Sequence, residues 1–286
     1  MMETQLGKFN QLRIVKEVDF GQYLDGGDLG EILLPQRYVL SDSKVGDSIE
    51  VFLYLDSNER IVATTKTPLV QVGQYAYLEV VWINEYGAFL DWGLMKDLFV
   101  PFGEQRVKME KGKKYVVYAY IDDATYRIVA SSKIDSFLTR PTATDLSQDE
   151  KVELLVWDQT DLGYKVIINN RYGGLIYNNE VFQPIAIGMR LDGYVGQVRP
   201  DGKVDVTLQL TGKKNVVEFV DVLLSRLQSQ EDGFLPYHDK SPAEDIYDEF
   251  RVSKKTFKKG IGDLYKRRLI TLLPNGIQLV KKKSSL

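Results

Sequence analysis

The feature that most constrains this chain is an internal repeat. The segments VDFGQYL, EILLP, KVGDSIEVFLYLD and RIVATTK are followed, in the same order, by NEYGAFLDWG, DLFVP, EKGKKYVVYAYID and RIVASSK. Gly21 and Gly87 are 66 residues apart, and so are Pro35 and Pro101. A third, looser copy reads TDLGYKVIINNRYGGLIYNNE, IGMRLDGYVGQV and GKVDVTLQL. Since each copy should be one structural unit, the repeat predicts three similar small domains.

Each copy has the pattern of a small β-barrel. Short alternating runs of β-branched and aromatic residues are separated by Gly, Asn and Asp, which is typical of closely spaced strands. Residues 116–121 and 127–131 form one predicted hairpin. About five strands in roughly 65–75 residues fit the OB-fold, a partly open Greek-key barrel. Gly21, Gly87 and Gly163 lie inside strand patterns, where we expect a bend or a close approach of two backbones.

The periodicity changes from two to 3.6 at about residue 213, which predicts helices. Ser241 is expected to cap a second helix, with Pro242 in its first turn and Glu244 completing a capping box. A third helix is predicted over residues 254–268. The first predicted helix has these apolar positions: Val216, Val217, Phe219, Val220, Leu223, Leu224 and Leu227.

Two predicted strands, 269–273 and 277–280, follow the third helix. They flank Pro274, Asn275 and Gly276, and Asn-Gly is a strong signal for a hairpin turn. Three helices closed by a hairpin predict a winged helix-turn-helix. The predicted fold class is therefore multidomain and mainly β, with three tandem OB-fold β-barrels followed by an α+β winged helix-turn-helix domain. The predicted domains span residues 1–66, 67–138, 147–212 and 213–286.

The net charge of −3 conceals a strong asymmetry along the chain. Residues 251–286 contain eleven Lys and Arg against one acid, Asp263, so they carry +10 and leave −13 for the rest. Such asymmetry favours a polyanionic partner for the basic end. The alternative is a solvated helix face with a charged tail.

The third predicted helix carries most of these cations, and in helix-turn-helix proteins that helix is the recognition helix. Pairs of lysines spaced four apart form one stripe. Because lysine makes point-charge contacts, binding to a nucleic-acid backbone with little sequence preference is expected. The alternative is a helix face tuned for solubility. The cations are Lys254, Lys255, Lys258, Lys259, Lys266, Arg267 and Arg268.

Aromatic residues recur beside the glycines of the first two copies. Phe20 and Tyr23 flank one glycine, and Tyr86 and Phe89 flank the other. OB-folds that bind single strands stack bases on the aromatic face of strands 2 and 3 and hold phosphates with cations. The alternative is that one ring of each pair packs inside its barrel.

The residues Tyr86-Gly87-Ala88-Phe89-Leu90, followed by Leu98-Phe99-Val100-Pro101 and Arg127-Ile128-Val129-Ala130-Ser131, resemble the S1 domain of RNA-binding proteins. Three such repeats plus a winged helix are similar to the conserved virulence factor B family of bacterial S1-like RNA-binding proteins. The resemblance implies S1-like barrels, binding of single-stranded RNA and post-transcriptional control of gene expression. The RNA face that it implies comprises Phe20, Tyr23, Asp56, Arg60, Tyr86, Phe89, Asp122 and Arg127.

The chain departs from the S1 pattern at several positions. A histidine frequent in S1 domains is replaced by Leu34 and Val100 in the first two copies. The third copy has Leu162 and Lys165 in place of the aromatics, while Tyr177 takes the histidine position. There the resemblance implies stacking on Tyr177 and phosphate contacts from Lys165 and Arg199, or a mainly spacing role for this domain. Since the residues outside the basic end carry a net charge of −13, we expect the isolated barrels to bind weakly.

Composition and motifs argue against other classes of protein. The absence of cysteine excludes disulfides, thiolate metal sites and a cysteine nucleophile. Neither a signal peptide nor an apolar run of membrane-spanning length is found, so a soluble, cytoplasmic protein without a membrane partner is expected. The sole histidine, His238, lies in a linker-like segment, and no phosphate-binding loop occurs, so neither an enzyme nor a cofactor is expected.

The sequence therefore predicts a non-catalytic protein that binds single-stranded RNA through its barrels and its basic winged helix. Two alternatives stay open. One is a DNA-binding transcription regulator whose winged helix reads duplex DNA. The other is an interaction module that docks on the ribosome or another complex.

Overall fold

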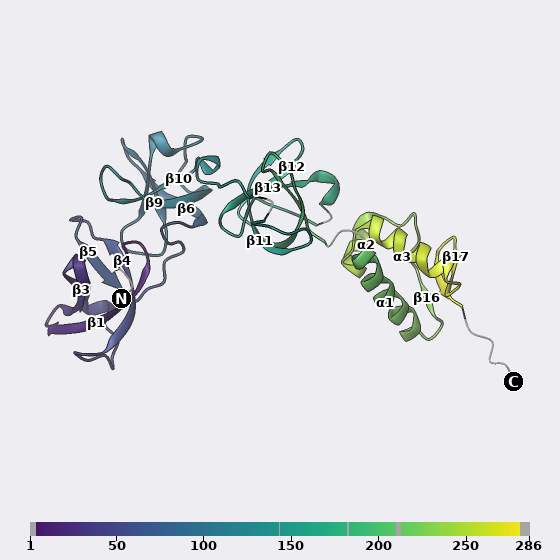
Figure 1. Ribbon diagram of the computed structural model, residues 1–286, viewed down its shortest axis with the longest axis horizontal. Helices are drawn as coiled ribbons and strands as arrows, with labels where there is room; N and C mark the ends of the chain where they lie inside the picture. Colours follow the sequence, from purple (N-terminus) through teal and green to yellow (C-terminus); the bar gives the residue numbers. More distant parts are fainter. Residues whose placement is uncertain (1–3, 143, 182, 210–212, 281–286) are drawn as a thin grey trace. The chain divides into compact units, whose positions relative to one another are not determined.

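The computed structural model describes residues 4–142, 144–181, 183–209 and 213–280, with side chains at all of these except 179 and 213–218. The chain divides into two compact units, residues 1–138 and 139–286 (Figure 1). The predicted apolar positions Val216 and Val217 have side chains outside this description. The last three C-terminal cations, Lys281, Lys282 and Lys283, lie outside the described residues altogether.

Strands β1–β15 of the described residues close into three five-stranded barrels, which we call barrels 1, 2 and 3 (Figure 1). In each barrel the strands pair in the order first, second, third, fifth, fourth, with the third and fifth parallel. This confirms the predicted OB-fold class. Barrel 1 consists of β1 (Phe9–Val18), β2 (Gly21–Asp25), β3 (Glu31–Pro35), β4 (Ser48–Leu55) and β5 (Ile61–Thr64). Barrel 2 consists of β6 (Tyr75–Ile83), β7 (Gly87–Asp91), β8 (Leu98–Pro101), β9 (Lys114–Ile121) and β10 (Ile128–Ser131). Barrel 3 consists of β11 (Lys151–Thr160), β12 (Gly163–Ile168), β13 (Tyr172–Tyr177), β14 (Arg190–Val198) and β15 (Val204–Thr207).

The three repeat glycines each open the second strand of a barrel where two backbones meet closely. A Cβ on Gly87 would lie 2.2 Å from the carbonyl oxygen of Val100 in the facing strand. The corresponding distances at Gly21 and Gly163 are 2.1 and 2.0 Å. Real Cβ contacts are never this short, so only glycine fits. The close approach expected from the sequence is confirmed.

Replacing Gly87 by alanine should therefore destabilise barrel 2. The added methyl group meets backbone rather than a movable side chain, so we expect a loss of about 1–3 kcal/mol in the free energy of unfolding. Denaturant unfolding followed by tryptophan fluorescence would measure it, because Trp82 and Trp92 lie in this barrel. Gly103→Ala is the matched control, since a Cβ there meets no atom within 4 Å. Equal stability of the two variants would contradict the prediction.

The hydrophobic core of barrel 2 extends into barrel 1, which also has a core of its own. Phe52 of β4 packs edge-on against Trp92 of barrel 2, with ring centroids 5.8 Å apart, and both are almost fully buried in the same cluster. The Trp92 indole N–H donates to the carbonyl oxygen of Lys96 at 2.6 Å, and the Lys96 ammonium donates to the carbonyl oxygen of Asp56 at 2.9 Å. These contacts hold the β4–β5 turn of barrel 1 against barrel 2.

The C-terminal domain is a winged helix, as predicted. Its elements are α1 (Lys213–Ser229), β16 (Phe234–Leu235), α2 (Ala243–Phe250), α3 (Lys254–Lys266), β17 (Ile270–Leu273) and β18 (Gly276–Leu279). The helices bury apolar faces against one another, because apolar residues recur at helical spacing on the inward side of all three. That core includes Phe219, Val220, Leu223, Leu227, Ile246, Phe250, Phe257, Ile261 and Leu264. Gln209, just after barrel 3, accepts from the Ser253 N–H and donates to the Arg251 carbonyl oxygen, each at 3.0 Å.

One local prediction in this domain is wrong. Ser241 does not form the capping box, because its hydroxyl accepts instead from the His238 N–H at 3.0 Å, and Pro242 occupies the N-cap without a side-chain bond. The short strand β16 lies between α1 and α2 and pairs with β18. The predicted hairpin is confirmed, and because Leu273 pairs with Gly276, its two-residue turn is Pro274-Asn275.

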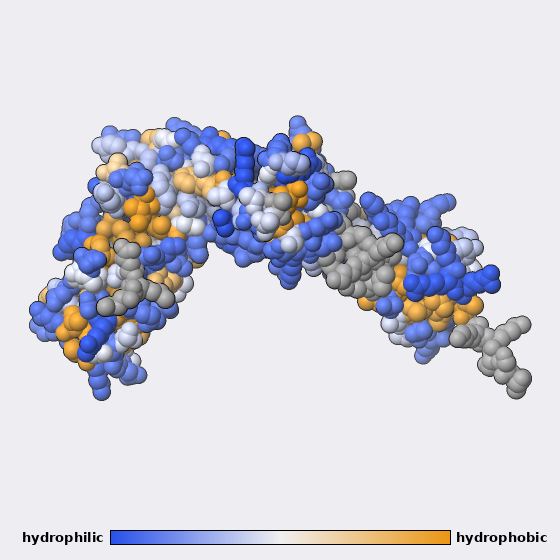
Figure 2. All heavy atoms as spheres, viewed as in Figure 1, coloured by the Kyte–Doolittle hydropathy of each residue, from blue (hydrophilic) through white to orange (hydrophobic). Residues whose placement is uncertain are grey.

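Most of the face drawn in Figure 2 is hydrophilic, with hydrophobic residues in small patches among the polar ones. Within the described residues, no helix is long and apolar enough to cross a membrane.

Candidate nucleic-acid interface

Three aromatic rings form a row across the first three strands of barrel 2. Trp82 of β6 pairs with Phe89 of β7, which pairs with Phe99 of β8, so their side chains emerge on one face. Trp82 lies flat on Phe89, with ring centroids 3.8 Å apart and an interplanar angle of 7°. Phe89 and Phe99 are 4.8 Å apart. Partly exposed rings stacked on a barrel face can extend the stack to a nucleobase.

Tyr86, in the turn between β6 and β7, lines one pocket with Phe89 and Phe99 and has an exposed fraction of 66%. The Asn84 side chain fixes the turn that carries it, because its Oδ1 accepts from the backbone N–H groups of Tyr86 and Gly87 at 2.8 and 3.1 Å. Trp82 is 43% exposed, and its indole N–H donates to Asp97 at 2.9 Å. Barrel 2 therefore presents an aromatic surface, which we call the ring platform: Trp82, Tyr86, Phe89 and Phe99.

The corresponding row of barrel 1 contains fewer rings. Lys16 pairs with Tyr23, and Tyr23 pairs with Leu33. The Lys16 ammonium lies 5.6 Å from the centroid of the Tyr23 ring. Phe20 is 57% exposed and contacts Tyr23 edge-on at 6.3 Å. None of the four predicted rings beside the glycines belongs to a barrel core, since Tyr23 and Phe89 are only partly buried on the outer face.

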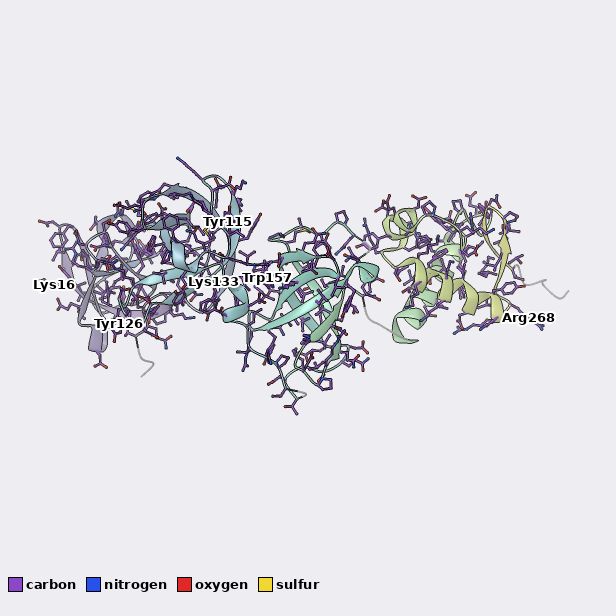
Figure 3. The ribbon with its side chains drawn as sticks, turned by 90° about the horizontal axis from the view of Figure 1, so that it is seen from above. Lys16, Tyr115, Tyr126, Lys133, Trp157 and Arg268 are labelled. Atoms are coloured by element: carbon purple, nitrogen blue, oxygen red, sulfur yellow. The ribbon has the colours of Figure 1, made fainter. Side chains whose placement is uncertain are left out.

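Barrel 3 replaces rings by charge at these positions. Asp158 pairs with Lys165, the counterpart of Tyr23 and Phe89. The Lys165 ammonium lies 4.8 Å from the Trp157 ring centroid and 3.9 Å from an Asp158 oxygen. Lys16 and Trp157, labelled in Figure 3, come from the first strands of barrels 1 and 3. This row can contact a phosphate through Lys165 but offers little stacking surface.

Asp56 and Arg60 pair within barrel 1. The Arg60 guanidinium donates to Asp56 Oδ2 at 2.7 and 3.0 Å, and 69% of the Arg60 side chain is exposed. Partial burial acts to raise the pKa of Asp56, but hydrogen bonds from the Arg60 side chain and from the backbone of Arg60 and Asn58 lower it. The aspartate is thus an anionic brace that orients Arg60.

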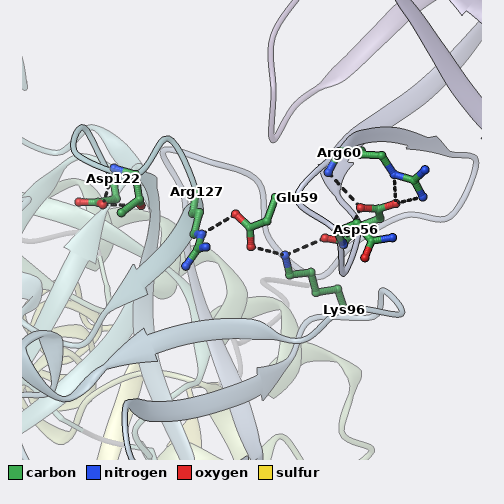
Figure 4. Close-up of polar contacts among 8 residues, drawn as sticks. Asp56, Glu59, Arg60, Lys96, Asp122 and Arg127 are labelled. Carbon is green, nitrogen blue, oxygen red and sulfur yellow. Dashed lines mark hydrogen bonds and ion pairs between the residues drawn. The ribbon is translucent and has the colours of Figure 1, made fainter.

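Arg127, the counterpart of Arg60 in barrel 2, has a different partner. Asp122 accepts from the backbone and hydroxyl of Thr125 and closes its own turn. Arg127 instead donates to the carboxylate of Glu59, a residue of the β4–β5 turn of barrel 1 (Figure 4). Glu59 also accepts from Lys96 at 3.4 Å. The expected Asp–Arg grouping is therefore present in barrel 1 but not in barrel 2.

A pocket of about 220 Å³ lies beside this ion pair. Barrel 1 contributes Leu55 and Glu59, while barrel 2 contributes the remaining walls. The barrel 2 residues are Asn84, Tyr86, Phe89, Trp92, Lys96, Asp97, Leu98, Phe99, Arg127, Ile128 and Val129. The pocket thus combines three rings of the ring platform with two cations.

The strand register corrects the predicted histidine position. Leu34 and Val100 point into the barrel cores and are fully buried. The outward side chains beside Tyr23 and Phe89 belong to the preceding residues, Leu33 and Phe99. Sequence comparison of the repeats alone misses Phe99 because it lies one residue away from the expected position.

Tyr177 is also displaced from the position assigned to it. It pairs with Gly163, as Pro101 pairs with Gly87. The counterpart of Phe99 in barrel 3 is therefore Leu175, which pairs with Lys165, and Tyr177 lies two residues beyond it. Its hydroxyl accepts from the Arg199 guanidinium at 2.6 Å, and Arg199 also donates to Asp205 at 2.9 Å. These contacts leave Arg199 partly engaged within the barrel.

The α3 helix presents the predicted basic stripe. Lys255, Lys258 and Lys259 are exposed, whereas Lys254 is partly buried. The opposite face of α3 packs into the core through Phe257, Ile261 and Leu264, and the Ser253 hydroxyl caps the helix by accepting from the Thr256 N–H at 3.1 Å. The stripe is therefore held on a rigid, well-packed helix.

Two predicted arginines follow the stripe. Arg267 forms an ion pair with Asp263, with Nε 2.8 Å from Oδ2, so part of its charge is compensated. Arg268, labelled in Figure 3, lies exposed between α3 and β17.

Comparisons with known proteins agree with this architecture. Residues 6–66 match the family described as S1 domain, and residues 221–279 match the family described as CvfB-like winged helix domain. Both are nucleic-acid-binding domain families rather than known enzymes.

The chain is similar to a Bacillus subtilis (strain 168) protein named Uncharacterized protein YitL, with 30% identity covering 89% of this chain and 87% of that protein. Conserved virulence factor B of Staphylococcus epidermidis (strain ATCC 12228) is 25% identical, covering 91% and 90%. A crystal structure of a multidomain protein with nucleic acid binding domains from Streptococcus pneumoniae TIGR4 covers 96% of this chain and 98% of its own, at 24% identity and a TM-score of 0.41.

Proposed function

The chain belongs to the conserved virulence factor B family, and on that premise we propose that it is a non-catalytic protein that binds single-stranded RNA. The ring platform of barrel 2 is the observation that carries this proposal. Its rings offer exposed aromatic surface that unpaired bases can reach, whereas the base faces of a duplex are hidden by stacking. RNA rather than DNA is favoured by the S1 domain family.

The other domains contribute in an unequal way. Barrel 1 adds Phe20 and Tyr23 together with Lys16 and Arg60, a smaller version of the same surface. Barrel 3 supplies Lys165 for backbone contact and serves mainly as a spacer. The α3 stripe adds phosphate contacts, and several weak sites on one chain raise the overall affinity when they bind one strand together. The biological role that we propose is post-transcriptional control of gene expression, by a protein acting in the cytoplasm.

A competition experiment tests this proposal. A labelled oligouridine 20-mer bound to the full chain is displaced by unlabelled single-stranded RNA or by duplex DNA of equal length at 0.15 M salt. Single-stranded RNA should compete at least ten times better, because only unpaired bases can stack on the rings. Better competition by duplex DNA would favour the transcription regulator. Absence of binding to either would favour a docking module.

A further inference from the structure

The ion pair between barrels 1 and 2 places an anion where barrel 2 would hold a phosphate. In barrel 1 the turn arginine, Arg60, is paired within its own barrel by Asp56. In barrel 2 the partner of Arg127 is Glu59, which belongs to the other barrel (Figure 4). Carboxylates and phosphates are alternative partners for the guanidinium group, because both accept its paired N–H donors. Glu59 therefore occupies the anion site of barrel 2.

The pocket beside this ion pair has the dimensions and walls for a small aromatic group. Its volume of about 220 Å³ is below the roughly 300–1,000 Å³ typical of sites for whole drug-sized ligands. Phe89 and Phe99 contribute aromatic walls, and Leu55 provides an apolar wall from barrel 1. Asn84 and Asp97 add polar groups to the lining. This mixture suits one nucleobase rather than a chain of stacked bases.

We propose that the junction of barrels 1 and 2 is a single-nucleotide site, in which the pocket takes one nucleobase and the strand phosphate displaces Glu59 from Arg127. This inference rests on the proposed RNA-binding function and assigns one site within it. Glu59 acts as a stand-in for phosphate that keeps Arg127 oriented while the site is empty.

The exchange is feasible because the ion pair is partly exposed. The Arg127 and Glu59 side chains are 52% and 41% exposed, and pairs of this kind contribute little to stability. Glu59 is nevertheless a carboxylate at neutral pH. Partial burial acts to raise its pKa, but the hydrogen bond from Arg127 and the charges of Lys96 and Arg127 lower it. A nearby strand phosphate thus competes with a charged but weakly held partner.

The exchange is tested by Glu59→Gln in the full chain, with an oligouridine 12-mer as probe. Removing the competing charge should tighten binding about two- to fivefold, which is the range expected for an exposed ion pair. Glu50→Gln is the matched control, because it removes the same charge from an exposed position of β4 in barrel 1 that does not line the pocket. In an Arg127→Gln background the gain from Glu59→Gln should vanish.

Two outcomes would overturn the exchange: no gain for Glu59→Gln over Glu50→Gln, or an equal gain without Arg127. Because the wild-type chain is titrated in parallel, failure of RNA binding as such is distinguished from failure of this inference. If RNA binding as such fails, the wild type does not bind the probe. If only this inference fails, the wild type binds and the variants do not differ as expected.

The base pocket is tested separately by Leu55→Trp, which fills it from barrel 1. We expect oligouridine affinity to fall about fivefold or more, the effect of losing one stacked base. Leu55→Met keeps the pocket open and should bind as the wild type does. Unchanged affinity of a folded Leu55→Trp variant, verified by its melting temperature, would rule out a base in this pocket. If that variant does not fold, the Glu59 and Arg127 variants still decide the proposal.

Discussion

Replacing Tyr86 and Phe89 together by alanine should weaken binding of single-stranded RNA by the largest factor of any change in the barrels. Tyr86 is the most exposed ring of the ring platform, and Phe89 lies between Trp82 and Phe99 and holds the row together. Loss of one stacked base costs about 1–3 kcal/mol, so we expect a Kd roughly five- to 150-fold higher. Fluorescence anisotropy of a labelled oligouridine 20-mer would measure this.

Tyr77→Ala is the matched control for this variant. Tyr77, in β6, is a second exposed tyrosine of barrel 2, but it pairs with Val116 of β9 and does not line the pocket. It should leave the affinity unchanged. An unaltered Kd for the Tyr86/Phe89 variant, in a protein that unfolds at the wild-type temperature, would remove the ring platform from RNA binding. The barrels would then be better explained as docking surfaces.

The repeat made the barrel architecture predictable because its glycines lie at positions where no other residue fits. Gly21 and Gly87 recur at one offset since each lies where a Cβ would collide with the facing strand. Alternating apolar residues between such glycines leave few other ways to bury the apolar face of short strands. The rings beside the glycines were found for the same reason, because the turn that needs glycine also sets the start of β2 and β7.

Trp82 and Phe99 were missed because the repeat does not indicate the register in which the strands pair. The pairing of β6 with β7 shifts between Val80 and Trp82 at a bulge, which moves the following side chains to the other face. A displacement of one residue likewise exchanges Val100 for Phe99 on the outer surface. Such shifts depend on backbone contacts across strands, so a single sequence gives no direct signal for them.

The Glu59–Arg127 pair was unpredictable for a different reason. The two residues are 68 positions apart and belong to different barrels. Their contact depends on how the two barrels share the core around Phe52 and Trp92. The repeat even suggests the wrong partner, since it aligns Asp122 with Asp56. One extra residue in the β9–β10 turn lets Asp122 bond to Thr125 and leaves Arg127 for Glu59.

The lysines of the α3 stripe lower the stability of the helix that carries them. Lys254 and Lys255 lie in the first turn of α3, where the helix dipole is positive and an acidic residue would be favourable. Lys254 and Lys258, like Lys255 and Lys259, are also like charges at i, i+4 spacing. An anionic ligand along this face would relieve both repulsions. Solubility alone does not require lysines on an exposed helix face, since the exposed face of α2 carries acidic residues and no lysine.

Neutralising the stripe should therefore reduce the salt dependence of RNA binding. In the variant Lys255→Gln, Lys258→Gln, Lys259→Gln and Arg268→Gln, all four residues are exposed. Each phosphate contact to a single strand contributes about −0.7 to the slope of log affinity against log salt. We expect the slope to become shallower by up to about three, with weaker binding at low salt. The control variant replaces Lys108, Lys111, Lys113 and Lys114 of barrel 2, four other exposed cations, by glutamine. Since both variants lose the same charge, equal slopes would show that net charge rather than α3 determines the salt dependence.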